Sequence, residues 1–215
     1  MKKIAVILLG FISVKSFGQG KLGIEAGFNS AQFSTSNNSN VSFSAVSSFN
    51  IGLLDQERIN KTFFWQTGLF FSGKGTKQDR AEFVQYGRTS TMKLDYLQIP
   101  LNLGFDFNLH KGLKGMLGTG LYAAYGIHGT EKGYDVGISG TQNVDNTVKF
   151  SNTESGSSSE THIKPFDAGY NVLAGLEWKS FELTANYSMG LANIDPGPTV
   201  YKNKVTSIGI TYFFK

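Results

Sequence analysis

The sequence predicts an all-β protein, an eight-stranded antiparallel up-and-down transmembrane β-barrel with apolar side chains outside and polar side chains inside. Three observations predict it: two-residue alternation in eight segments, alternating short and long connections, and aromatic residues gathered near one end of the strands. A period of two is typical of strands, because successive side chains point to opposite faces. The 215 residues, with 26 glycines and 18 phenylalanines, suit a single barrel domain.

The first 18 residues resemble a secretory signal peptide, so the mature barrel domain is expected to span residues 19–215. Residues 2 and 3 are basic, residues 4–12 are apolar, and small residues at 16 and 18 suit a cleavage site. Nine apolar residues are too few for a transmembrane helix, which needs about 20. Loss of three lysines with the signal leaves 17 basic against 16 acidic residues, so charge gives no reason to expect nucleic acid.

Eight strands are predicted after this segment. They are Leu22–Ser30, Ser47–Leu54, Phe63–Ser72, Leu94–Phe107, Leu113–Ile127, Phe166–Trp178, Phe181–Leu191 and Val205–Phe214. Strands two and three, four and five, and six and seven have short links, whereas the other links are long and polar: residues 34–45, 74–93, 129–165 and 192–204. Short turns at one end and long loops at the other are the layout of outer-membrane barrels. An even strand count then returns both termini to the short-turn, periplasmic end.

The sixth and seventh strands form the clearest hairpin. Apolar residues occupy the even positions before the turn and the odd positions after it. A two-residue turn places its flanking residues opposite each other, so Trp178 is expected to pair with Phe181, and both apolar rows share one face. The other face is rich in Gly, Asn, Ser, Thr and Glu, a composition that suits a barrel lumen. A soluble exported barrel with an apolar ligand inside is the alternative, and it requires the apolar row to face inward.

Aromatic residues of the outward rows gather near the short-turn ends. Amphipathic rings favour the level of the lipid headgroups, so we expect a girdle at the periplasmic interface. Its predicted members are Phe63, Trp65, Phe107, Trp178, Phe181, Tyr212 and Phe214.

The segment Tyr96–Leu103, Tyr-Leu-Gln-Ile-Pro-Leu-Asn-Leu, resembles the Tyr-Leu-Glu-Ile-Pro-Leu segment of the PorT-like outer-membrane β-barrel family of Bacteroidetes. A Gly-Thr-Gly-Leu-Tyr stretch at residues 118–122 agrees with that family. Gln98 stands where the family has glutamate. The resemblance also leads us to expect a β-bulge beside Pro100, since proline is disfavoured within a paired strand.

The closing strand is similar to the terminal signal read by the barrel-assembly machinery. The matching positions are Ser207, Gly209, Tyr212 and Phe214, although Lys215 follows the last aromatic residue. The family resemblance implies a location in the outer membrane, contact with outer-membrane lipids, and a contribution to cell-surface assembly, secretion or adhesion. It also implies a surface or secretion-system protein partner, reached through the Gly129–Pro165 loop.

The inward rows predict a charge network at the periplasmic end. Glu177 faces Glu182 across the hairpin, which is unfavourable unless a cation or water separates the carboxylates. Lys114 lies on the inward row of the neighbouring strand, and Asp106 is just across a short turn. We therefore expect Asp106, Lys114, Glu177 and Glu182 to form a structural network that plugs this end.

The sequence offers no assembled catalytic, metal or cofactor motif. A lipid-modifying barrel hydrolase, the alternative function, needs a histidine beside a serine and an acid near the membrane surface. Only His128 lies at the outer end of a strand, and the strand register fixes no serine beside it. The segment from Gly68 to Gly75 resembles a phosphate-binding loop but lacks its Ser or Thr. We therefore expect no enzyme activity, no cofactor and no metal.

The longest link is the predicted contact surface. Residues 134–138 and 147–150 alternate around 142–146, which predicts a hairpin extending strands five and six beyond the membrane. An exposed strand edge there would pair with a partner strand. Residues 155–159 are of low complexity.

Overall fold

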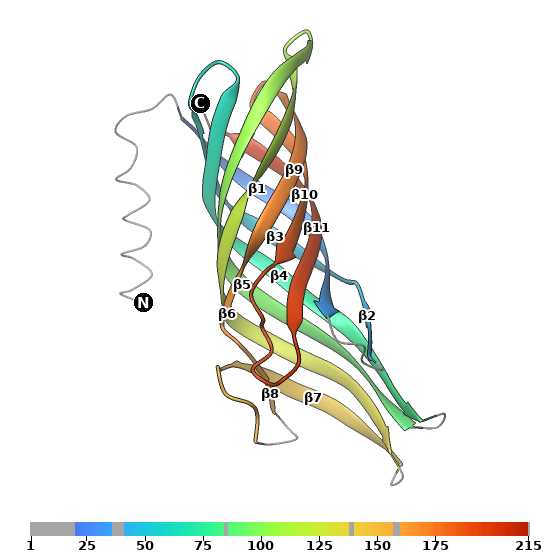
Figure 1. The fold of residues 1–215 in the computed structure, drawn as a ribbon. Coiled ribbons are helices and arrows are strands. Elements are labelled where there is room, and N and C mark those ends of the chain that lie inside the picture. Colours follow the sequence, from blue (N-terminus) through green and yellow to red (C-terminus); the bar gives the residue numbers. More distant parts are fainter. Residues whose placement is uncertain (1–19, 36–40, 84–85, 138–139, 157–159, 215) are drawn as a thin grey trace.

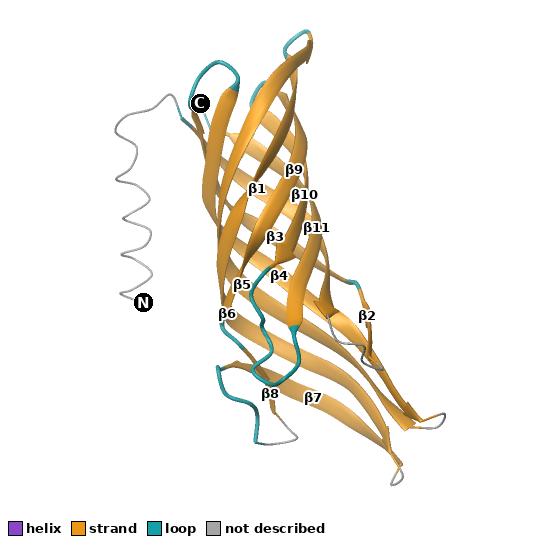
Figure 2. Ribbon diagram, in the orientation of Figure 1, coloured by secondary structure: helices purple, strands orange, loops and turns teal. Residues whose placement is uncertain are grey.

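The computed structural model describes residues 20–35, 41–83, 86–137, 140–156 and 160–214. The predicted signal peptide lies outside these residues. No helix among them is long and apolar enough to cross a membrane, and the regular structure is all β (Figure 2). The strands are β1 Lys21–Thr35, β2 Val41–Ser44, β3 Val46–Arg58, β4 Phe63–Phe83, β5 Tyr86–His110, β6 Leu113–Gly137, β7 Gly140–Phe150, β8 Glu160–Ile163, β9 Phe166–Trp178, β10 Phe181–Gly190 and β11 Tyr201–Phe213 (Figure 1).

Antiparallel pairing joins eight of these strands into a closed ring. Its order is β1, β3, β4, β5, β6, β9, β10 and β11, and β11 pairs again with β1. The closing pair runs from Gly23 opposite Phe213 to Thr35 opposite Tyr201. β2, β7 and β8 are additions to the ring: β2 pairs with β4, β7 with β6, and β8 runs parallel to β7. The all-β barrel predicted from the alternation is therefore present.

The two ends of the ring differ. One end, here called the turn end, carries the β3–β4, β5–β6 and β9–β10 turns and the end of β11 (Figure 1). The β5–β6 turn holds Lys111 and Gly112 at φ 43° and 85°, and Lys179 of the β9–β10 turn has φ 56°. At the opposite end, here called the extended end, β4, β5, β6 and β7 project well beyond the rest (Figure 1).

The hairpin register is as the sequence predicts. Trp178 pairs with Phe181, and Glu177 pairs with Glu182. The apolar row faces outward: Val172 is 50% exposed and Leu183 46%. The polar row faces inward, with Thr184 9% exposed. This result confirms the prediction that apolar side chains face outward and polar side chains face inward. The alternative, a soluble barrel with its apolar row inside, is wrong.

Two predicted loops are largely strand. Residues 74–93 continue the β4–β5 ladder to Phe83 opposite Tyr86, because the alternation continues: Thr76, Ser90 and Met92 are buried. In the longest link, β6 reaches Gly137 and β7 returns beside it. The expected turn at residues 142–146 is wrong, since these residues pair with β6 and the reversal lies before Gly140. The returning strand is also not an extension of β9, which begins only at Phe166.

The predicted bulge beside Pro100 is wrong as well. Thr67 pairs with Leu101 and Phe70 with Gln98, so the β4–β5 ladder loses two pairs at this point but gains no extra residue. Proline has no N–H to donate, and the Pro100 carbonyl instead accepts a hydrogen bond from Thr67 Oγ1 at 2.8 Å.

A register shift does occur four to five residues before Pro100, on the β5–β6 ladder. Asp95 pairs with His128 and Tyr96 with Gly126, so Ile127 is the extra residue of a β-bulge. Ile127 and His128 are both exposed, and beyond them the buried residues of β6 are Gly129 and Glu131, at odd positions.

We expect Val172→Arg to destabilise the barrel in lipid vesicles by about 2–4 kcal/mol, because the new charge would face hydrocarbon. The measurement is urea unfolding, followed by the fluorescence of Trp65 and Trp178. Tyr134→Arg is the matched control: Tyr134 is 48% exposed on the projecting part of β6, so its effect should stay within about 0.5 kcal/mol. Equal losses in both variants would contradict a lipid-covered Val172.

Candidate functional site

The turn end of the interior holds charged side chains, and the predicted network assembles there only in part. Asp106 Oδ2 lies 2.6 Å from Arg58 Nη2 and 3.4 Å from Lys114 Nζ. Glu177 instead pairs with Lys21. Glu182 lies opposite Glu177 on the β9–β10 ladder, makes no ion pair with a described residue, and accepts a hydrogen bond from Gln66 Nε2 at 3.3 Å.

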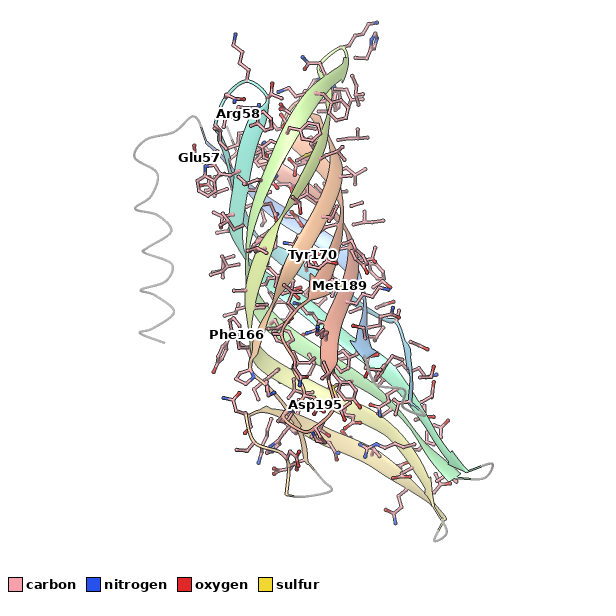
Figure 3. All side chains as sticks on the ribbon, in the orientation of Figure 1. Glu57, Arg58, Phe166, Tyr170, Met189 and Asp195 are labelled. Atoms are coloured by element: carbon pink, nitrogen blue, oxygen red, sulfur yellow. The ribbon has the colours of Figure 1, made fainter. Side chains whose placement is uncertain are left out.

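Sequence reasoning missed Arg58 and Lys21. Arg58 fell in an expected turn, but it is the last residue of β3 and lies near the turn end (Figure 3). Lys21 precedes the expected start of its strand by one residue. Extending each strand by its own alternation would have placed Arg58 on the inward row.

A second ion pair lies deeper, between β4 and β9. Lys74 Nζ is 2.9 Å from Asp167 Oδ2, and the two side chains are 1% and 0% exposed. Asp167 also accepts hydrogen bonds from Asn203 Nδ2 at 2.9 Å and from the Tyr122 hydroxyl at 3.2 Å. The ammonium lies 4.2 Å from the Tyr122 ring centroid and 5.0 Å from that of Tyr96. Cation–π contacts and hydrogen bonds thus offset the loss of solvation of this pair.

Sequence reasoning missed this pair because Lys74 was expected in a loop. Its resemblance to the lysine of a phosphate-binding loop has no structural counterpart, since residues 68–75 are continuous strand. Asp167 did stand on the inward row, which was the one available indication of a buried acid.

An apolar cluster fills the interior at the extended end. Its buried members are Phe33, Met92, Leu94, Tyr96, Tyr122, Ala124, Val148, Ile163 and Ile194. The rule of a polar interior therefore fails at this end. The cluster is covered by β8 and the segment before β11, where Lys164 N donates to Ile194 O at 2.8 Å and Ile194 N to Tyr201 O at 2.9 Å. The cluster and the Lys74–Asp167 pair together obstruct the lumen.

A pocket of about 360 Å³ lies over this cluster. Glu131 in its wall bonds Arg88 at 2.9 Å and the Thr161 hydroxyl at 2.5 Å. Asp195, also in the wall, lies at the opposite end of the barrel from Arg58 (Figure 3). Lys149, 2.5 Å from Glu160, lowers the pKa of that carboxyl by a hydrogen bond. Polar side chains of the loops thus surround the apolar floor of the pocket.

His128 lies on the outer surface, where the β-bulge turns it away from the interior. Its Nδ1 is 3.2 Å from Asp95 Oδ2, and no serine bonds it in the described part of the chain. Across the described ranges, no three His, Cys, Asp or Glu side chains group as metal ligands.

A family model described as outer membrane protein beta-barrel domain matches residues 17–195 of the sequence. The chain belongs to this family. It is accordingly an outer-membrane protein, as the alternation and the loop lengths predict. A search of curated proteins found no match.

The chain is similar, at low sequence identity, to several solved outer-membrane proteins. Ail, the attachment invasion locus protein of Yersinia pestis, is 14% identical, with 91% of this chain and 99% of that chain covered and a TM-score of 0.43. Neisserial surface protein A is 15% identical, with 90% and 97% covered and a TM-score of 0.44. OprG from Pseudomonas aeruginosa is 14% identical, with 92% and 97% covered and a TM-score of 0.47.

The aromatic side chains of the predicted girdle lie at the turn end of the barrel. Of the seven expected girdle residues, six are 40–51% exposed and Trp65 is half-buried. Several pack against their neighbours: the Phe181 and Tyr212 rings are tilted with centroids 5.2 Å apart, and Tyr212 and Phe214 meet edge to face at 5.9 Å. In the closing strand, Ser207 pairs with Asn29 and Gly209 with Gly27.

We expect Lys74→Met to destabilise the barrel by about 3–5 kcal/mol, because it leaves the Asp167 carboxylate buried without its cation. The double variant Lys74→Met/Asp167→Asn should recover most of that loss, since it removes both charges. Urea unfolding in vesicles measures both. Lys77→Met is the control, because Lys77 is half exposed and 3.9 Å from Asp79. Additive losses in the double variant would show that the two groups are not coupled.

Proposed function

We propose that this protein is a non-enzymatic outer-membrane β-barrel whose projecting strands and loops form a contact surface for cell-surface assembly, secretion or adhesion. The observation that carries the proposal is the extension of β4, β5, β6 and β7 beyond the apolar outer band. The β4–β5 ladder continues from Lys74 opposite Leu94 to Phe83 opposite Tyr86, which corresponds to about 30 Å of strand. Such a length exceeds what the membrane requires and supports a role outside it.

The surface of this extension is polar. The side chains of Lys93, Lys132, Asp135 and Asp145 are exposed, in contrast to the apolar rows below them. β7 also has a free edge, because within the described residues Gly140–Asn146 pair only with β6. A strand edge that faces water offers backbone N–H and C=O groups to an extended partner segment. The predicted pairing with a strand of the partner protein would occur at this edge of β7.

The obstructed interior argues against conduction through the barrel and so favours a role as a contact surface. Side chains nearly fill an eight-stranded ring, and here the Lys74–Asp167 pair and the apolar cluster obstruct it. Catalysis has no comparable support, because His128 lies among exposed residues with Asp95 as its described partner.

Several finer assignments belong to the same proposal. The ring is one eight-stranded up-and-down transmembrane barrel of the PorT-like type, residues 1–18 are its signal peptide, and residues 19–215 are the mature domain. The turn end faces the periplasm with the aromatic girdle at its interface, and the closing strand is read by the barrel-assembly machinery. The charges at Asp106, Lys114, Glu177 and Glu182 have a structural role. The pairing around the ring and the exposed rings at the turn end support these assignments.

The test is site-specific photo-crosslinking in intact cells. A photoreactive residue at position 134, on the projecting strand, should give protein or polysaccharide adducts. The same residue at position 166, on the lipid-facing surface, should give none. Absence of adducts from position 134 and from two further positions on β7 would contradict the proposal.

A shortened hairpin gives a second test. Gly133 pairs with Val144, so replacing residues 134–143 with Asn-Gly keeps the register and forms a two-residue turn. We expect the shortened protein to keep its heat-dependent gel mobility and to lose the adducts formed from β7. Unchanged crosslinking would place the contact surface elsewhere.

A further inference from the structure

The polar interior contains a cavity of about 70 Å³ between the charged turn end and the Lys74–Asp167 pair. A space that admits one water measures about 10–15 Å³ on the same scale, so this cavity has room for an ion and several waters. Its wall is formed largely by oxygen-bearing side chains of the inward rows, among them Glu25, Asn50, Gln98, Glu182 and Asn186.

Five of the wall oxygens have no hydrogen-bond partner among the described residues. They are Asn29 Oδ1, Asn50 Oδ1, Gln98 Oε1, Glu182 Oε2 and Asn186 Oδ1. Asn29 and Glu182 are each 1% exposed. A buried acceptor left unpaired is unfavourable, so five around one cavity indicate that its contents donate hydrogen bonds or accept electron pairs, as water and a cation do.

Hydrogen bonds of the amide nitrogens fix the orientation of three of these groups. Asn29 Nδ2 donates to Gly73 O at 2.9 Å, Asn50 Nδ2 to Glu25 Oε1 at 3.0 Å, and Asn186 Nδ2 to Ser188 Oγ at 3.1 Å. Turning any of these amides round would break its bond. The amide oxygens, and not the amide nitrogens, are therefore the atoms that can contact a ligand in the cavity.

The same wall carries two carboxylates without a cationic partner. Glu25 and Glu182 both pair with Thr211, one from each side, and line the cavity. In the described part of the chain neither makes an ion pair; Glu25 bonds Asn50 and Thr211, and Glu182 bonds Gln66. Lys74 also lines the cavity, but Asp167 already neutralises it. Two buried carboxylates that share a wall favour a bound positive charge.

Glycine keeps one part of the wall open. A Cβ at Gly209 would lie 2.8 Å from Glu25 Oε1, and one at Gly27 would lie 2.4 Å from Asn50 Oδ1. Any larger residue at these two positions would push the carboxylate and the amide oxygen out of their places.

We propose that this cavity binds one hard metal cation through oxygen ligands alone. Glu25 and Glu182 supply the charge, the amide oxygens of Asn50 and Gln98 supply neutral ligands, and water completes the shell. Carboxylate and amide oxygens with water are the ligands that Na⁺, K⁺ and Ca²⁺ accept, and they do not suit soft metals.

The test uses the full chain, refolded into detergent micelles after treatment with a chelator. NaCl, KCl and CaCl₂ are each titrated at constant ionic strength against choline chloride. We expect one cation to bind per barrel by calorimetry and the urea midpoint to rise with its concentration, as ligand linkage requires. The salt that produces both effects distinguishes a monovalent from a divalent ion.

Variants locate the site. Glu182→Gln should lower the cation affinity at least tenfold, and so should Gly209→Ala, which keeps both charges but narrows the cavity. Glu57→Gln is the control, because Glu57 pairs with Trp65 on the outward face of β3. The cation affinity of this variant should match that of the unmodified protein.

Three outcomes would overturn the proposal. If choline chloride stabilises the barrel as well as the metal salts do, the effect is one of ionic strength alone. If no salt binds and Glu182→Gln is more stable than the parent, a proton neutralises the carboxylates. If both cavity variants bind as tightly as Glu57→Gln, the cation lies elsewhere.

Discussion

The pairing of β1 with β11 is the interaction on which the rest of the structure depends. In hydrocarbon an unpaired backbone N–H or C=O group is costly, so a sheet can cross a membrane only if it has no open edge. The thirteen pairs from Gly23–Phe213 to Thr35–Tyr201 remove that edge. Once the ring is closed, the two-residue period leaves each side chain one of two directions, lipid or lumen.

The narrow lumen forces polar side chains together, and most of their charges are neutralised locally. Lys74 pairs with Asp167, Lys21 with Glu177, and Asp106 with both Arg58 and Lys114. These pairs fix neighbouring strands to one another from the inside. Glu25 and Glu182 line the cavity without an ion-pair partner among the described residues, and this distinguishes the middle of the interior from its ends.

The interior changes character at the extended end for the same physical reason that made it polar below. Beyond the membrane the outside of the strands meets water, so apolar side chains are stable on the inside. Met92 and Leu94 of β5, Val148 of β7 and Ile163 of β8 form the apolar cluster there. β6 changes its inward row at the Ile127 bulge, which marks the transition on that strand. The outer strands can thus project as an ordered sheet with its own small core.

The sequence by itself determined where the eight ring strands lie, but not how far β4 and β5 extend. It also determined the lipid-facing row and the Trp178–Phe181 register, because alternation and a two-residue turn are local properties. It predicted Asp106 beside Lys114 for the same reason, since a short turn joins their strands. Only the tertiary structure decided that Lys74 meets Asp167, 93 residues away, and that Lys21 meets Glu177, 156 residues away. Contacts across the lumen depend on the stagger of the strands around the ring, and period-two alternation leaves that stagger open.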